Sequence, residues 1–178
     1  MDDIFGKIIA LILAVLLLFV APILLTFENQ DETSRIYVLS ETSKFVDSVR
    51  SLGYISPTFY EDYQKKLSNT NNLYEIKMEH YHLSHDPVYT DFSDSSTFQN
   101  DFKVNYKATY NQDILDEIYP APETRGVYKM SKGDYFCVLV YNKNKTFATK
   151  IQEMLYSTPL SASKIVVNYG GVVKDEIN

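Results

Sequence analysis

The hydrophobic pattern begins with an uncharged apolar run near the amino terminus. Residues 8–27 read IIALILAVLLLFVAPILLTF, and fifteen of these twenty are Leu, Ile, Val or Phe. A helix of this length spans about 30 Å, which matches the hydrocarbon core of a bilayer. A cleaved signal peptide is the alternative, but its apolar region is usually only about 7–15 residues long and follows a basic start. The run therefore predicts an uncleaved transmembrane helix over residues 8–27.

Charges beside this run predict its orientation in the membrane. Lys7 precedes the run, whereas Glu28, Asp31 and Glu32 follow it. Because basic residues favour the cytoplasmic side, we expect residues 1–7 in the cytoplasm and residues 28–178 outside the plasma membrane. Within the run, Pro22 predicts a bend near residues 18–22. The run also contains two small side chains four residues apart, Ala10 and Ala14. Such a pair would let another helix approach closely.

An amphipathic pattern continues directly from the apolar run. Neither Pro nor Gly interrupts residues 23–52, and Gly53 offers a left-handed stop. The pattern predicts one long helix over residues 7–52, with its second half packed on a head domain. Apolar residues at helical spacing form the predicted stripe: Ile36, Val38, Leu39, Phe45, Val46, Val49 and Leu52.

Shorter elements follow in the head. Ser56-Pro57 predicts the start of a helix that runs to Leu67. Strict alternation over residues 73–83 predicts a strand on which His80 and His82 share a face. We expect a long loop over residues 84–102, then a strand over 102–110 and a helix over 112–119.

The last part of the head has the strongest strand signal. Residues 127–130 and 135–141 flank a turn signal and predict a hairpin, whose apolar second arm YFCVLVY suits a central strand covered on both faces. A helix is predicted over residues 145–156, capped by Asn142 or Asn144, with Phe147, Ile151 and Leu155 facing inward. Residues 164–174 predict two short strands or one bulged strand. Together these elements predict an α+β head with an antiparallel sheet packed by helices.

Composition and charge limit the function. The formal charge of −6 argues against nucleic acid as a partner, because phosphates require a basic face. Cys137 is the single cysteine, so no intrachain disulfide can form, and its apolar strand predicts an inert thiol. The sequence contains no nucleophile elbow, phosphate-binding glycine loop or zinc-protease motif. We therefore predict that the protein is not an enzyme and has no catalytic or cofactor-binding residues.

Two clusters could hold a metal ion. His80 and His82 could reach one ion from a shared strand face, with His85 or Asp86 completing the set of ligands. A structural role at the end of a sheet is the simpler interpretation, because cysteine ligands and a second cluster are missing. Calcium could bind acidic side chains of the predicted loop, but these lack the EF-hand spacing and a solvated loop is preferred. They are Asp86, Asp91, Asp94 and Asp101.

The outline of the chain resembles a known group of proteins. A short amino terminus, an apolar helix containing Pro22, an amphipathic continuation and an α+β head are similar to pilins and pseudopilins, most of all to TadE-type minor pilins of Tad secretion systems. Residues 45–56 and 167–176 are similar to an uncharacterised family of small anchored proteins of Gram-positive bacteria. Gly6 is followed by Lys7 rather than phenylalanine, and the span has no glutamate, so the resemblance does not extend to pilin processing.

The resemblance implies a structural or assembly subunit of a surface pilus or secretion apparatus. Its partners would be the lipid bilayer and other membrane or pilus subunits, with oligomer formation by the protein itself. The large tyrosine content, 15 of 178 residues, also suits a surface that binds other proteins. The alternative is an anchored extracytoplasmic domain that binds a ligand or acts as a sensor.

Overall fold

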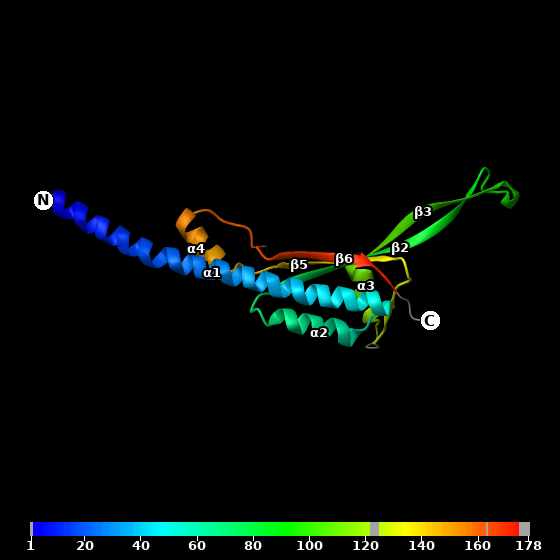
Figure 1. The fold of residues 1–178 in the computed structure, drawn as a ribbon, viewed down its shortest axis with the longest axis horizontal. Coiled ribbons are helices and arrows are strands. Elements are labelled where there is room, and N and C mark those ends of the chain that lie inside the picture. Colours follow the sequence, from blue (N-terminus) through cyan, green and yellow to red (C-terminus); the bar gives the residue numbers. More distant parts are fainter. Residues whose placement is uncertain (1, 122–124, 163, 175–178) are drawn as a thin grey trace.

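The computed structural model describes residues 2–121, 125–162 and 164–174 of the chain. A long helix, α1 (Asp2–Leu52), leads from the amino terminus into a head of strands and shorter helices (Figure 1). The predicted α+β class and the antiparallel sheet packed by helices are confirmed. The last two residues of the similar stretch 167–176 lie outside the described residues.

Helix α1 is unbroken through Pro22, and its two halves have different surroundings. Its most apolar 18-residue window has a mean hydropathy of 3.3, and none of that window is buried. By length and composition α1 could cross a membrane. The second half buries four of the predicted apolar residues in the head, Val38, Phe45, Val46 and Val49.

The predicted apolar stripe of α1 is too wide. Ile36, Leu39 and Leu52 are exposed by 59%, 41% and 43%, respectively. The head buries Val38, Phe45, Val46 and Val49, so only the centre of the predicted stripe is covered. Ile36 and Leu39 are consequently not part of the head core.

The main sheet has the strand order β3-β2-β5-β6, and every neighbouring pair is antiparallel. Its strands are β2 (Tyr74–Tyr89), β3 (Phe98–Tyr110), β5 (Tyr135–Asn142) and β6 (Val166–Val172). One face packs on α1, where the rings of Phe45 and Phe136 lie 6.4 Å apart between centroids. Helix α2 (Pro57–Ser68) begins as predicted, with the Ser56 hydroxyl accepting a hydrogen bond from the Phe59 amide.

The predicted hairpin before β5 is wrong. Strand β4 (Tyr128–Lys129) pairs with β1 (Tyr54–Ile55), which lies directly after α1. Strand β5 is central as predicted, but only one of its faces is fully buried, because Tyr135 on the other face is 39% exposed. Strand β6 is one strand without a bulge, and a Cβ at Gly170 would lie 2.4 Å from the Cβ of Cys137.

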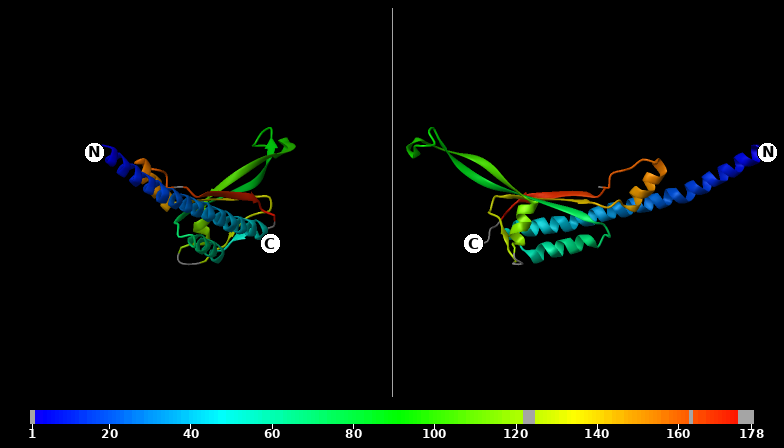
Figure 2. Two further views of the ribbon diagram at one scale, coloured as in Figure 1. Left: turned by 60° about the vertical axis from the view of Figure 1, so that its left-hand side comes forward. Right: turned by 180° about the vertical axis from the view of Figure 1, so that it is seen from behind.

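The loop predicted over residues 84–102 is mostly strand. Strands β2 and β3 continue as a two-stranded ribbon, joined by residues 90–97 with the short 3₁₀ helix η1 (Ser95–Thr97). Beyond Tyr81, β2 pairs with β3 alone, so the ribbon leaves the sheet and projects from the head (Figures 1 and 2). We call residues 82–107 the arm. The many Ser and Asp residues of this region concealed its strand pattern.

Two short helices complete the head. Helix α3 (Asn111–Ile118) follows β3 and buries Ile114 and Ile118. Helix α4 (Phe147–Tyr156) was predicted, but its cap is Thr146 rather than Asn142 or Asn144. Its inner residues are Ala148 and Thr149, whereas Phe147 and Leu155, predicted to face inward, are exposed by 64% and 42%.

Candidate functional site

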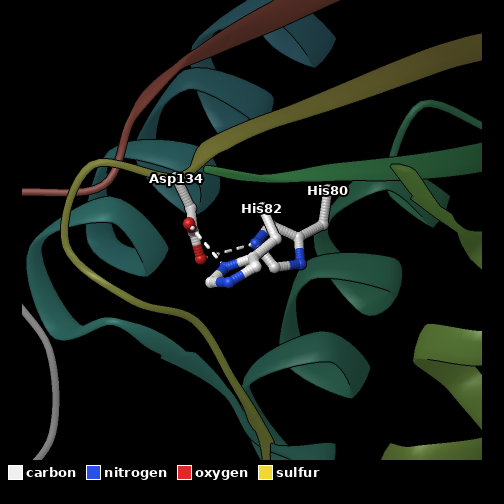
Figure 3. Close-up of side chains that lie close together, drawn as sticks. All are labelled: His80, His82 and Asp134. Atoms are coloured by element: carbon white, nitrogen blue, oxygen red, sulfur yellow. Dashed lines mark hydrogen bonds and ion pairs between the residues drawn. The ribbon is translucent and has the colours of Figure 1, made fainter. Parts of the chain in front are cut away.

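Two histidines and one aspartate meet where the arm leaves the sheet. His80 and His82 lie on the same face of β2, as predicted, and Asp134 lies in the turn before β5 (Figure 3). His80 Nε2 lies 2.8 Å from Asp134 Oδ2, and His82 Nδ1 lies 2.9 Å from Asp134 Oδ1. One carboxylate therefore joins both imidazoles.

The third member of this cluster differs from the prediction. His85 points to the opposite face of β2 from His82 because side chains alternate along a strand. The Asp86 carboxylate accepts hydrogen bonds from Ser84 and Asn105 within the arm. Sequence reasoning missed Asp134, although an aspartate directly before an all-apolar strand was a usable signal.

Asp134 is almost completely buried, with 1% of its surface exposed. Besides the histidines, the Leu83 amide donates to Oδ1 at 3.0 Å and the Ser131 amide donates to Oδ2 at 2.8 Å. Each carboxylate oxygen therefore accepts two hydrogen bonds. This arrangement ties the turn before β5 to the point on β2 where the arm begins.

The protonation state of Asp134 follows from these contacts. Burial raises the pKa of Asp134, but the amide and histidine hydrogen bonds outweigh it and hold the pKa below its usual value. An ionised carboxylate can only accept hydrogen bonds, so His80 Nε2–H donates to it. The other ring nitrogen, Nδ1, lies 2.6 Å from the Tyr128 hydroxyl and forms a hydrogen bond with it.

The same three side chains form a ligand set for a metal ion. One ligand atom from each lies within 4.8 Å of the others, and among the described residues no further group of three His, Cys, Asp or Glu side chains comes as close. Two imidazoles and one carboxylate suit Zn²⁺ or Fe²⁺ with positions left open for a ligand. An ion would replace the two histidine–aspartate hydrogen bonds. The hydrogen bond between His80 Nδ1 and the Tyr128 hydroxyl would then orient the His80 ring as a ligand.

A cleft gives solvent access to this cluster. The His82 side chain is 46% exposed there, in contrast to His80 and Asp134. Three acidic side chains of α3 line the cleft together with two lysines, so its charged groups have a small negative excess. The cleft is lined by His80, His82, Lys107, Thr109, Asp113, Asp116, Glu117, Pro120, Tyr128 and Lys129.

The carboxylates considered for calcium do not converge. Asp91 and Asp94 accept hydrogen bonds from the Ser93 and Ser96 amides in the turn at the arm's tip. Asp101 accepts from the following amide in β3. Each of these side chains organises its own stretch of backbone, so the arm offers no shared calcium site among the described residues.

Cys137 lies on the outer face of β5. Burial raises the pKa of its thiol to about 11, with a further contribution from the charge of Glu79. A thiol with so high a pKa is almost entirely protonated near neutral pH, so it is a poor nucleophile. This agrees with the inert thiol predicted from the sequence.

No protein family model, curated protein or solved structure matches this chain.

Proposed function

We propose that the protein is a non-catalytic structural or assembly subunit, anchored in the plasma membrane by α1 and pilin-like in outline. It would serve a surface pilus or secretion apparatus with its head outside the cell. The observation that supports this most strongly is an apolar face of the arm that no other part of the described chain covers.

The arm has one apolar face and one polar face. Paired residues share a face, and the pairs Leu83↔Tyr106 and Pro87↔Phe102 bring apolar side chains together. Phe102, Val104 and Tyr106 are exposed by 54%, 50% and 62%. The alternate positions of β3 between them carry Lys103, Asn105 and Lys107. A half-buried strand has this alternation, so the arm is patterned for a partner that covers it.

The apolar face continues from the arm onto the outer face of the sheet. A shallow groove there is lined by side chains from three strands and from the turn before β5. Exposed apolar surface of this extent marks a protein interaction site more often than a solvated surface. The residues that line this groove are Tyr81, Tyr106, Gly133, Tyr135, Cys137 and Val172.

The length of α1 supports a second copy of this chain as the partner that covers the arm. Its 51 residues correspond to a rod of about 76 Å, from the membrane-spanning half into the head. Copies of this chain in one membrane would therefore hold their heads at the same height and in related orientations. The arm of one copy would lie at the level of the arm or sheet of the next, so we propose a second copy as the occupant.

Cysteine crosslinking of the full-length protein in vesicles tests this assembly. We expect Tyr106→Cys on the apolar face to form dimers with a short bismaleimide, and Lys107→Cys on the polar face to form far fewer. Both variants also carry Cys137→Ser, because Cys137 lines the same groove as Tyr106 and could react with the new cysteine within one chain. Equal dimer yields from both variants, or only monomer from both, would refute self-assembly through the arm.

A second candidate function is an anchored domain that binds a ligand or acts as a sensor, and the cluster at Asp134 favours it.

We expect the purified full-length protein to bind one Co²⁺ or Zn²⁺ ion. His82→Ala removes a ligand and should weaken binding by about tenfold or more, whereas His85→Ala should not, because His85 lies on the other face. Co²⁺ absorption bands and calorimetry measure the affinity. No binding by the wild type, or an equal effect of both variants, would leave the cluster with a structural role alone.

A further inference from the structure

Helix α4 carries an apolar stripe that points away from the protein. Phe147, Ile151, Met154 and Leu155 follow the spacing of one helical face. Phe147, Met154 and Leu155 are exposed by 64%, 79% and 42%, although a stripe of this kind normally packs on a core. The predicted apolar stripe of this helix therefore exists, but its side chains are largely exposed to solvent instead of buried in the head.

Helix α4 lies beside α1 at the point where the apolar run ends (Figure 1). The rings of Phe27 and Phe147 stack with 5.4 Å between their centroids. Thr146, the cap of α4, donates a hydrogen bond of 2.7 Å to Asp31, and Gln152 donates one of 2.6 Å to Glu28. These contacts hold α4 at the level of residues 27–31.

We propose that α4 is an interfacial helix whose apolar stripe enters the outer leaflet of the bilayer, between the headgroups and the acyl chains. This inference rests on the proposed membrane anchor, because residues 27–31 mark the water boundary only if residues 8–27 span the lipid. Phe147 and Met154 are exposed at that boundary. In a bilayer these side chains would contact lipid instead of water. Short amphipathic helices bind membrane surfaces in this manner.

The chemistry of the helix ends fits a lipid partner better than a protein partner. Tyr156, 66% exposed at the carboxyl end, has the amphipathic ring that is enriched at membrane interfaces. The Lys150 ammonium lies 5.3 Å from the centroid of the Phe147 ring, so its chain follows the apolar stripe while its charge can reach a phosphate. The stacked rings of Phe147 and Phe27 connect the stripe to the end of the apolar run of α1.

This contact would give the head a second point of attachment. Helix α1 alone leaves the head free to rotate about the helix axis in the membrane. A second helix lying in the interface fixes that rotation and therefore the direction in which the arm projects. Neighbouring copies would then present their arms in a defined orientation.

Tryptophan fluorescence can test the contact, because the chain contains no tryptophan. Three single-tryptophan variants of the full-length protein are reconstituted in vesicles with lipids brominated along the acyl chain. Phe19→Trp reports on the span, Met154→Trp on α4, and Phe92→Trp on the arm's tip, where Phe92 is 92% exposed. We expect strong quenching for Phe19→Trp and Met154→Trp and none for Phe92→Trp.

The three variants separate the inference from the proposed anchor. Quenching of Phe19→Trp without quenching of Met154→Trp would overturn the interfacial helix and leave the anchor intact, and a protein partner covering α4 would give the same result. Absence of quenching at Phe19→Trp would refute the anchor itself. Equal thermal unfolding of the three variants confirms that each head is folded.

Discussion

Asp134→Ala should destabilise the head by about 3–5 kcal/mol, because it removes the partner of several buried groups at once. His80 is 5% exposed and would lose the acceptor of its Nε2–H. The Leu83 and Ser131 amides would lose their acceptor as well. Chemical unfolding of the full-length protein in detergent measures the loss.

Asp86→Ala is the matched control for this variant. The Asp86 carboxylate also accepts hydrogen bonds from neighbouring side chains, but it lies exposed on the arm. Its loss should change the free energy of unfolding by less than about 1 kcal/mol. An equally small effect of Asp134→Ala would show that the cluster does not hold the turn to β2.

The pKa of Asp134 adds a dependence on pH to this prediction. Because the pKa is lower in the folded state, the carboxylate contributes stability that is fully present above its unfolded value of about 3.9. That contribution is lost as the pH falls from there through the lower folded value. The wild type should therefore lose its advantage over Asp134→Ala in acid, as unfolding at a series of pH values would show.

Leu13→Asp combined with Leu17→Asp should abolish membrane insertion. Two aspartates near the centre of the span cost about 6–8 kcal/mol, including the two lost leucines. The fifteen large apolar residues of the span supply at most about 5–9 kcal/mol, and those near its ends supply less than those at its centre. The two aspartates therefore offset most or all of the free energy of insertion. The control is Ile36→Asp combined with Leu39→Asp, which places the same charges on exposed positions of α1 beyond the span. Membrane fractionation should separate the variants, and retention of the first variant in the membrane would contradict the predicted span.

Local patterns were sufficient to predict much of the fold. The end of α1 and the start of α2 follow from Gly53 and the Ser56-Pro57 pair, both of which act within a few residues. The start of α1 was predicted at residue 7, whereas the helix begins at Asp2. The alternation in residues 73–83 placed His80 and His82 on one face, as observed. These features depend on neighbours in the sequence, which are known without the fold.

Features that depend on distant parts of the chain could not be predicted. Strand β4 pairs with β1, which lies more than seventy residues earlier in the chain, and no nearby residue signals this. Asp134 reaches His82 only because Tyr81 pairs with Tyr135, and this register follows from the packing of the whole sheet. The sequence therefore identified two of the three side chains that converge, His80 and His82, and considered His85 or Asp86 where the structure has Asp134.

The direction of an apolar stripe was also beyond the sequence. Phe147, Ile151 and Leu155 were recognised as one face of a helix, and burial in a protein core was the expected reason. In helix α4 the small Ala148 and Thr149 are buried, whereas the larger Phe147, Met154 and Leu155 remain exposed. A periodic pattern identifies an apolar face, but it does not state whether protein or lipid covers that face.

We expect residues 8–27 to remain in the mature protein as its membrane anchor. Mass spectrometry of the protein recovered from carbonate-washed membranes is the test. The protein should stay in the membrane pellet, and its amino-terminal peptides should include residues 8–27. A soluble mature protein that begins near residue 28 would show instead that the apolar run is a cleaved signal sequence.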